Sequence, residues 1–319
     1  METPTLTTRA LGNWRVTPIG LGAMPMSWAG MEDHRDRAIA TVHAALDGGV
    51  TFLDSSDIYA PSWDQAGYSE RLLAEAMRTW TGSASQKSKV VIATKGGIIV
   101  TAEGGRRDAS YAHLRKACIA SLTALSVDQI DVYYLHWPAP VPSFEEQVEN
   151  MMRLRQDGLI KAVGFSNISA DQLQVAIDVG GTVAQGGVVA VQNEFSPRYR
   201  AHQDMIALTA RAGIAYVPWS PFGGADRAHH MGSQYAAFAD VAARHNASAY
   251  QIALAWLLKI SANIIPIPGA TRPETMRDSL GALSIDLCDS DFQLLSSSTP
   301  EGTSQYPNTK PAPRLRKSA

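Results

Sequence analysis

Short apolar runs alternate with longer stretches of helical periodicity along most of the chain, as far as about residue 285. Within residues 36–47, for example, Ile39, Val42 and Leu46 recur at the spacing of one helix face. Such alternation is typical of repeated βα units and of a parallel sheet. It predicts eight strands, at Pro18–Gly22, Thr51–Asp54, Lys89–Thr94, Gln129–His136, Ile160–Phe165, Val188–Asn193, Ile214–Trp219 and Asn263–Pro268.

Helical patterns fill the intervals between these strands, and several of them end at a glycine, which commonly stops a helix. They predict helices at Asp36–Asp47, Ser69–Trp80, Ser110–Leu125, Ser143–Gln156 and Asp171–Val179, an extra helix at Ser233–His245 and a further one at Ser248–Lys259.

Eight βα units close most naturally into a (β/α)8 TIM barrel, because eight parallel strands enclose an interior that side chains just fill. We expect a single domain over residues 1–319, with the barrel at about 17–285. A short β-hairpin at 7–16 could plug the N-terminal end of the barrel. The C-terminal tail, about 300–319, is expected at the surface, either disordered or folded over the barrel mouth.

A doubly wound open sheet is the alternative fold, and it usually carries a glycine-rich turn after its first strand. The candidate turn begins at Gly20, but Pro25 stands where the third glycine of the dinucleotide-binding fingerprint belongs. This difference favours the barrel.

Composition narrows the class of protein further. The chain is 45% hydrophobic and 18% charged, which indicates a globular protein with a sizeable core. Its net charge of −2 includes no basic stripe, so nucleic acid is not an expected partner. Cys118 and Cys288 indicate neither a disulfide framework nor a cysteine-rich metal site. With no apolar run of about 18 residues and no signal-like start, we expect a soluble cytoplasmic protein that does not enter a membrane.

Polar residues mark the ends of the predicted strands, where barrel enzymes place their chemistry. Asp54, Lys95 and His136 end three consecutive strands at equal intervals of 41 residues, and Tyr59 follows Asp54 by five. Later strands end in Ser166, Asn167, Gln192, Asn193, Trp219 and Ser220.

A lysine that closes a buried strand needs a neutralising partner, and Asp54 on the neighbouring strand is the obvious one for Lys95. An ammonium near the Tyr59 hydroxyl would lower the pKa of that tyrosine and make it a usable proton donor and acceptor. His136 could hydrogen-bond the same reacting oxygen. Taken alone, the ion pair or the histidine would more often be structural, but together they predict a site for carbonyl reduction or alcohol oxidation.

An ordered set of motifs resembles the aldo-keto reductase superfamily from about Thr8 to Leu283. The matching segments are Pro-Ile-Gly-Leu-Gly (18–22), Phe-Leu-Asp-Ser-Ser-Asp-Ile-Tyr (52–59), Ala-Thr-Lys (93–95), Asp-Val-Tyr-Tyr-Leu-His (131–136), Gly-Leu-Ile-Lys-Ala-Val-Gly-Phe-Ser-Asn (158–167), Val-Gln-Asn-Glu-Phe-Ser (191–196), Trp-Ser-Pro-Phe (219–222) and Ile-Pro-Gly-Ala (267–270). The resemblance implies a catalytic tetrad of Asp54, Tyr59, Lys95 and His136. It also implies hydride transfer between a nicotinamide cofactor, usually NADPH, and an aldehyde or ketone.

The same resemblance implies the cofactor site. Ser166, Asn167 and Gln192 match residues that hold the nicotinamide carboxamide, and Trp219 matches the aromatic residue on which the ring stacks. The complete set of implied cofactor-binding residues is Gly22, Met24, Asp54, Ser166, Asn167, Gln192, Trp219, Ser220, Pro221, Phe222, Gly223, Gly269, Thr271, Arg272, Asp278 and Ser279.

The adenosine phosphate segment, 269–279, departs from the family pattern. Asp278-Ser279 replaces the Glu-Asn of many members, and Gly269 stands where some branches have lysine. Arg272, and as a second candidate Arg277, could bind a 2′-phosphate, because a guanidinium suits a bidentate contact. NADP(H) is therefore predicted over NAD(H).

Substrate identity is not readable from the loops that follow the strands. Trp28, Trp63 and Trp137 either line a hydrophobic carbonyl pocket or pack loops onto the barrel rim. Arg106-Arg107 hints at an anionic substrate, although a solvated charge pair is the commoner case. A small carbonyl or alcohol is the expected partner, and the oligomeric state is open.

Two alternatives stay in view. The fold also serves as a nicotinamide-binding regulatory subunit of potassium channels with slow turnover, and the tetrad does not distinguish the two. A metal-dependent barrel hydrolase lacks ligands here, because the adjacent His229 and His230 cannot easily converge on one ion. No metal is expected.

Overall fold

Seven parallel strands form one curled sheet in the computed structural model, which describes residues 7–224, 228, 231–298, 300 and 302–305. The sheet has the order β11-β10-β9-β8-β5-β4-β3. Its strands are β3 (Leu21–Gly22), β4 (Phe52–Asp54), β5 (Val91–Gly96), β8 (Ile130–Leu135), β9 (Ile160–Ser166), β10 (Val188–Gln192) and β11 (Ala215–Tyr216). Each lies within or overlaps a predicted strand.

The eighth predicted strand, 263–268, joins the two edges of this sheet without being a regular strand. On one side the Ile265 amide donates to the carbonyl of Tyr216 in β11 at 2.8 Å. On the other side the amides of Gly20, just before β3, and Gly22, in β3, donate to the carbonyls of Pro266 and Pro268 at 2.9 and 3.1 Å. Neither proline has an N–H to donate in return, so the ladder toward β3 is one-sided. The ring is closed, as the barrel requires, but the prediction of a regular strand here is wrong.

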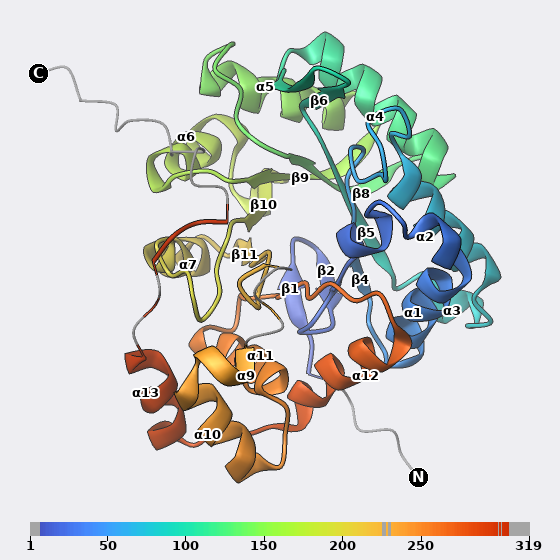
Figure 1. Ribbon diagram of the computed structural model, residues 1–319. Coiled ribbons are helices and arrows are strands. Elements are labelled where there is room, and N and C mark those ends of the chain that lie inside the picture. Colours follow the sequence, from blue (N-terminus) through green and yellow to red (C-terminus); the bar gives the residue numbers. More distant parts are fainter. Residues whose placement is uncertain (1–6, 225–227, 229–230, 299, 301, 306–319) are drawn as a thin grey trace, which may run out of the picture.

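Helices surround the sheet and alternate with its strands (Figure 1). They are α1 (Arg35–Asp47), α2 (Tyr68–Thr79), α3 (Ala84–Lys87), α4 (Tyr111–Leu125), α5 (Phe144–Gln156), α6 (Ala170–Gly180), α7 (Gln203–Arg211), α9 (Met231–Gln234), α10 (Ala236–His245), α11 (Ala249–Ile260), α12 (Pro273–Gly281) and α13 (Asp289–Ser297). Short 3-10 turns lie at Met24–Ser27, Glu32–His34, Val183–Gln185 and Ala282–Ser284. The α/β TIM-barrel fold predicted from the alternating pattern is confirmed.

Serine side chains fix where several of these helices begin. Ser110, Ser143, Ser169 and Ser248 each accept a hydrogen bond from the backbone N–H three residues later. These caps agree with the predicted starts of α4, α5, α6 and α11, and the predicted boundaries of α1 and α2, which have no serine cap, also agree with the structure to within one or two residues. The predicted helix 233–245 is split into α9 and α10.

The buried side chains form two cores. An outer core lies between the sheet and the helices, and an inner core fills the barrel. The inner core includes Leu11 and Val16 from the hairpin β1 (Arg9–Leu11) and β2 (Trp14–Val16), and neither side chain is exposed. The expected hairpin is therefore present and contributes to the barrel interior. Tyr134, another residue of the inner core, requires a glycine at position 164. A Cβ added to Gly164 would lie only 2.4 Å from the Tyr134 ring.

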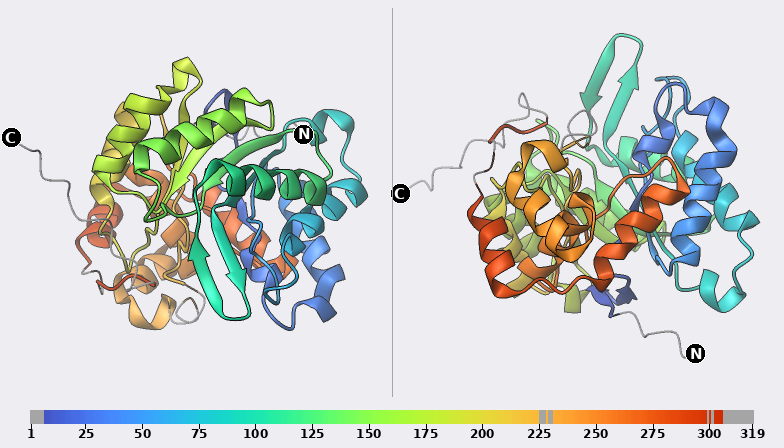
Figure 2. Two further views of the ribbon diagram at one scale, coloured as in Figure 1. Left: turned by 90° about the horizontal axis from the view of Figure 1, so that it is seen from above. Right: turned by 60° about the horizontal axis from the view of Figure 1, so that its bottom comes forward.

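Several elements are absent from the sequence prediction, among them the helices α3, α7 and α12. The hairpin β6 (Ile98–Thr101) and β7 (Gly104–Arg107) occupies the loop after β5, and it projects from one end of the barrel while β1 and β2 lie at the other (Figure 2). The helix α13 follows the barrel near the C-terminus. Most of the predicted tail, 306–319, lies outside the described residues.

Candidate active site

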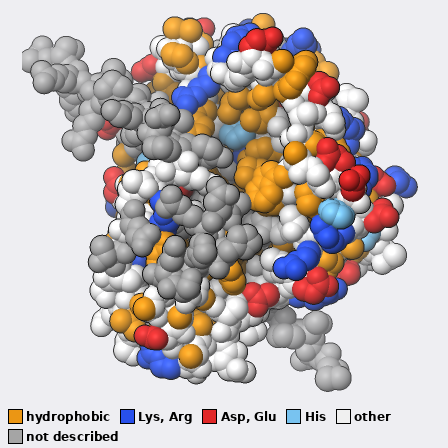
Figure 3. Space-filling model, in the orientation of Figure 1, with side chains coloured by type: hydrophobic (Ala, Val, Ile, Leu, Met, Phe, Trp, Pro, Cys, Tyr) orange, Lys and Arg blue, Asp and Glu red, His pale blue; other side chains and the backbone are white. Residues whose placement is uncertain are grey.

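A cavity of about 740 Å³ opens where the strands of the barrel end. Hydrophobic side chains surround a hollow in the face shown in Figure 3. Of the predicted cofactor-binding residues, all except Gly223 line the cavity. Asp54, Tyr59 and His136 line it too, and Lys95 lies buried beside them. The structure thus brings together residues that are far apart in the sequence.

Lys95 is completely buried, and each of its three ammonium protons has an acceptor within reach. The Nζ atom lies 2.5 Å from Oδ1 of Asp54, 2.7 Å from the carbonyl oxygen of Ser55 and 3.3 Å from the Tyr59 hydroxyl. Burial alone would lower the pKa of Lys95, but the charge of Asp54, together with Tyr59, outweighs it and raises that pKa. The ammonium is therefore held charged next to the tyrosine.

Asp54 is held in turn from its other side. Nε2 of Gln192 donates to Oδ2 of Asp54 at 2.8 Å, so both carboxylate oxygens are bonded. The ion pair and its partners come from β4, β5 and β10, whose ends meet at the barrel mouth. The residues that position the tyrosine are thus fixed by the sheet.

His136 follows the end of β8 and faces Tyr59, with ring centroids 5.7 Å apart in an edge-on arrangement. Burial, and secondarily the charge of Lys95, lowers the pKa of His136 well below its ordinary value. The imidazole is therefore neutral at pH 7. Its Nδ1 atom lies 3.0 Å from the Ser56 hydroxyl, which leaves Nε2 for a ligand in the cavity.

The predicted nicotinamide residues form a connected group at the same end of the cavity. Asn167 takes a left-handed backbone conformation, with φ of 60°, which is uncommon for a residue other than glycine. Its amide nitrogen donates to the His136 carbonyl at 3.0 Å, and its Oδ1 accepts from Nε1 of Trp219 at 3.1 Å. Ser166 donates to the Gln192 carbonyl at 2.7 Å. The indole of Trp219 is thereby oriented at the cavity wall.

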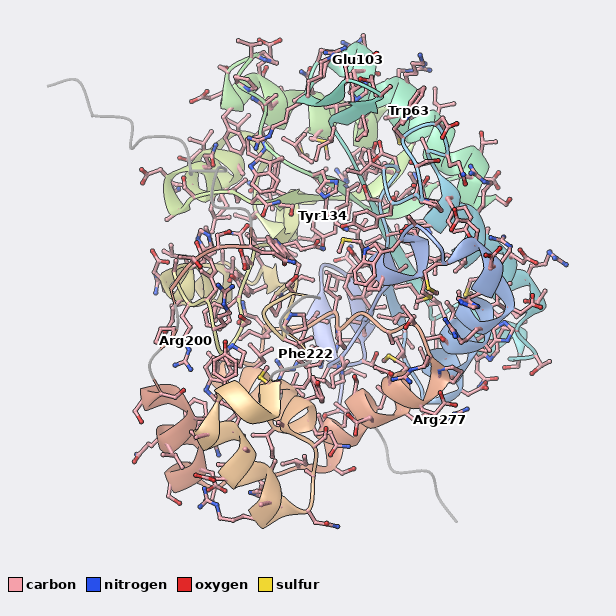
Figure 4. All side chains as sticks on the ribbon, in the orientation of Figure 1. Trp63, Glu103, Tyr134, Arg200, Phe222 and Arg277 are labelled. Carbon is pink, nitrogen blue, oxygen red and sulfur yellow. The ribbon has the colours of Figure 1, made fainter. Side chains whose placement is uncertain are left out.

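The loop after β11 runs along the middle of the cavity. Ser220, Pro221 and Phe222 line it, and the Phe222 ring packs edge-on against Tyr250 with centroids 5.2 Å apart. The predicted residue Gly223 does not line the cavity, whereas its neighbour Gly224 does. Figure 4 shows Phe222 beside α9 and α11.

The start of α12 forms another part of the cavity wall. Arg272 is the N-cap of this helix and lines the cavity, together with Thr271, Asp278 and Ser279. The free N–H groups of a helix start and a guanidinium suit a phosphate. Arg277, the second candidate, does not line the cavity, since it is largely exposed and lies 3.8 Å from Glu274 (Figure 4).

The three tryptophans proposed for the substrate pocket line two different cavities. Trp28 and Trp137 line the cavity near Tyr59 and His136. Trp63 is 54% exposed and lines a second cavity instead, near the β6–β7 hairpin (Figure 4). The Arg107 guanidinium lies 4.6 Å from the centre of the Trp137 ring. Neighbouring Arg106 pairs with Asp108 at 3.3 Å.

Sequence reasoning did not identify several lining residues, namely Pro25, Ile58, Ile98, Tyr250, Ala270 and Thr275. Ile58 directly precedes Tyr59, and Ile98 lies three residues after Lys95. Their closeness to the tetrad in the sequence could therefore have indicated that they line the cavity. Tyr250 lies in the first turn of α11, and nothing in its local pattern indicates that it reaches the cavity.

A model of the Aldo/keto reductase family matches residues 18–299. The chain belongs to this family. The resemblance carried by the ordered motifs is thereby confirmed, and with it the expectation of an oxidoreductase. Pyridoxine 4-dehydrogenase of Escherichia coli (strain K12) is 33% identical to this aldo/keto reductase over 298 residues, which cover 88% of this chain and 94% of that relative.

Solved structures agree with the fold. An aldo/keto reductase from Klebsiella pneumoniae in complex with NADP and acetate gives a TM-score of 0.76 at 24% identity, covering 92% of this chain and 95% of that chain. An aldo-keto reductase from Klebsiella pneumoniae in complex with NADPH gives a TM-score of 0.75 at 23% identity, covering 92% and 94%. These neighbours share the barrel with this aldo/keto reductase.

The described part of the chain contains no group of three or more histidine, cysteine, aspartate or glutamate residues that could hold a metal ion. Among the helices of that part, none is both long enough and apolar enough to cross a membrane. His229 and His230 lie outside the described residues.

Proposed function

We propose that the protein is an NADP(H)-dependent reductase of aldehydes or ketones that can also run as an alcohol dehydrogenase. The observation that carries this proposal is the convergence of the Lys95 ammonium, the Tyr59 hydroxyl and the neutral His136 ring at one cavity. A helix start that suits a phosphate, at Arg272, lines the same cavity.

The cavity residues fit a nicotinamide dinucleotide. Gly22 and Gly269 keep the cavity wall close-packed, because an added Cβ would lie 2.9 Å from the Ile267 carbonyl oxygen and 2.5 Å from Pro25, respectively. Trp219 would stack on the nicotinamide, Ser166, Asn167 and Gln192 would hold its carboxamide, and Arg272 would hold the 2′-phosphate. A bound reduced nicotinamide supplies the hydride that is added to the carbonyl carbon.

Tyr59 supplies the proton in this scheme. Its hydroxyl donates to the carbonyl oxygen and gives up the proton as that oxygen becomes an alcohol oxygen. The Lys95 ammonium, 3.3 Å away, stabilises the phenolate that remains. His136, being neutral, can orient the carbonyl through Nε2 without adding a charge. In the oxidation direction the same phenolate accepts the proton of the alcohol.

The proposed substrate class is a small carbonyl compound with an apolar or aromatic body. Trp28, Ile58, Ile98 and Trp137 line the part of the cavity around Tyr59. The relative from Escherichia coli is named pyridoxine 4-dehydrogenase, so pyridoxal belongs in a test panel with aromatic, aliphatic and sugar aldehydes. Negligible turnover of the whole panel with either NADPH or NADH would favour the binding-subunit alternative.

Replacement of Tyr59 tests the mechanism. In Tyr59→Phe we expect kcat for aldehyde reduction to fall by about 100- to 10,000-fold, because the proton donor is lost. The dissociation constant for NADPH, measured by fluorescence titration, should change little. Tyr111→Phe is the matched control, since that hydroxyl bonds Asp157 at the surface. Undiminished turnover in Tyr59→Phe would refute the role of Tyr59.

A further inference from the structure

Ser56 contacts residues that line two different cavities, the active-site cavity and a second cavity of about 750 Å³. Its side chain is completely buried and comes two residues after β4. His136 lines the first cavity and Asp57 lines the second. The second cavity lies beside the β6–β7 hairpin and also has Glu70 in its wall.

The Ser56 hydroxyl has its closest contacts with Asp57 and His136, and at longer distance it accepts from the Ile58 amide at 3.4 Å and reaches the Lys95 carbonyl at 3.5 Å. Its Oγ atom lies 3.0 Å from Oδ1 of Asp57 and 3.0 Å from Nδ1 of His136. A hydroxyl has a single proton, so Ser56 cannot donate to both atoms at once. For both contacts to be hydrogen bonds, either the Asp57 carboxyl or the His136 Nδ1 must itself carry a proton.

The protonation state of Asp57 decides between these two arrangements. If Asp57 is protonated, it donates to Ser56, and Ser56 donates to Nδ1, so the histidine proton sits on Nε2. If Asp57 is a carboxylate, it only accepts, so Ser56 donates to it and takes a hydrogen bond from a protonated Nδ1. His136 is neutral in either case, because burial and Lys95 keep its pKa low.

Asp57 is placed to change state near physiological pH. Burial, followed by the charge of Glu70, raises the pKa of Asp57 to about 8, against the bonds from Ser56 and the Ile58 amide and the charge of Lys95. Tyr133 is a further buried titratable group that interacts electrostatically with Asp57. The charged and titratable groups facing it across the second cavity are Arg71, Arg106, Asp108, His113 and Lys116.

We propose that Asp57, acting through the Ser56 hydroxyl, is a positioning residue that sets which ring nitrogen of His136 carries the proton. The inference deepens the proposed function, on which its catalytic meaning rests. With Asp57 protonated, Nε2–H is a hydrogen-bond donor to a substrate carbonyl. With Asp57 ionised, Nε2 presents a lone pair and no longer binds a carbonyl oxygen.

The proton balance of the change is complete. The Asp57 O–H bond breaks as a Ser56 O–H bond forms, and the former Ser56 proton forms the Nδ1–H bond. The Nε2–H bond breaks, and its proton leaves to solvent through the active-site cavity. One proton is lost overall, no charge remains on the imidazole, and the reverse sequence restores the first state.

Nitrogen NMR of histidine measures this tautomer directly. We would label the full-length protein with ¹⁵N-histidine, assign His136 by its loss in His136→Gln, and follow both ring nitrogens from pH 6 to pH 10. In the unsubstituted protein we expect Nε2–H at low pH and Nδ1–H at high pH, with a midpoint near 8. A tautomer that stays the same over this range would overturn the proposal.

Four variants separate this coupling from a general structural effect. In Asp57→Asn and in Ser56→Ala the tautomer should not change with pH, and either variant suffices if the other fails to fold. In Glu70→Gln the midpoint should fall by about one pH unit, because a like charge is removed. Asp108→Asn, a matched control in the same cavity, should keep the midpoint near 8.

The pH dependence of aldehyde reduction tests the consequence of the tautomer change for catalysis. For aldehyde reduction, kcat/KM of the unsubstituted enzyme should fall above the tautomer midpoint, and Glu70→Gln should move that fall to lower pH. An unchanged midpoint in Asp57→Asn would reject the proposal. If no aldehyde is turned over, the proposed function fails, but the NMR titration still decides whether Asp57 controls His136.

Discussion

At the scale of single residues, the positions of Arg272 and Arg277 decide which of them can bind a phosphate. Both belong to the same segment and have the same chemistry, but Arg272 precedes the first turn of α12 and lines the active-site cavity. Arg277 lies one turn further along and pairs with Glu274 in solvent. Only the former can meet a phosphate held at the helix start.

The two arginines therefore make a matched pair for testing cofactor preference. Arg272→Met should raise the dissociation constant for NADPH by about 10- to 100-fold, since a charge-assisted hydrogen bond contributes about 1.5–3 kcal/mol. The constant for NADH should change much less, because NADH has no 2′-phosphate. Arg277→Met should change neither constant in fluorescence titrations. Equal weakening of NADPH and NADH in Arg272→Met would contradict the 2′-phosphate assignment.

At the scale of elements, Arg9 ties the N-terminal hairpin to the last part of the barrel. Its guanidinium donates to the carbonyls of Leu258 at 2.6 Å, Ser261 at 2.7 Å and Ile264. These carbonyls belong to the end of α11 and to the segment that closes the sheet. Burial lowers the pKa of Arg9 to about 10, which leaves it charged at neutral pH.

Loss of the Arg9 hydrogen bonds should lower the free energy of unfolding. Arg9→Met leaves the α11 and closing-segment carbonyls without their donor, and we expect the free energy of unfolding in urea to fall by about 2–3 kcal/mol. Arg15→Met is the control on the same hairpin, since Arg15 is exposed and its hydrogen bonds among the described residues are to Thr8. That variant should stay within about 0.5 kcal/mol. Similar losses in both variants would show that Arg9 has no special role.

At the scale of the whole molecule, residues 302–305 return to the barrel mouth. The buried Glu194 accepts hydrogen bonds from the Ser304 hydroxyl at 2.6 Å and from the Gln305 amide at 3.1 Å. Arg198 donates to Thr303 at 2.8 Å, and Ser220 donates to the Gln305 side chain at 2.9 Å. Residues 302–305 thus connect the loop after β10 with the loop after β11.

Truncation tests whether these contacts hold the cavity loop. A chain ending at Ser298 loses them, so backbone amides of residues 220–224 should exchange with solvent on the order of tenfold faster, as expected for the loss of hydrogen bonds of about 1 kcal/mol each. A chain ending at Gln305 retains them and should exchange at the original rate. Equal exchange in the two truncations, followed by mass spectrometry, would show that residues 302–305 do not restrain the loop.

Much of the barrel and of its mouth was predictable because the determining signals are local. Apolar periodicity and serine caps set the helices, and a polar residue directly after a buried strand must lie at the sheet edge. Asp54, Lys95 and His136 lie at the ends of neighbouring strands, so their meeting with Tyr59 follows from strand order. The order of these residues also carries the family resemblance, which the match over residues 18–299 confirms.

The fold class, the family and most of the residues at the barrel mouth therefore follow from sequence patterns alone. Tertiary structure decided that Trp63 faces a second cavity, that Arg272 and not Arg277 faces the first, and that residues 302–305 reach Glu194. It also decided that Ser56 joins Asp57 to His136. The physical reason is that each of these contacts depends on the direction of a side chain and on partners distant in the chain, which periodicity and spacing do not encode.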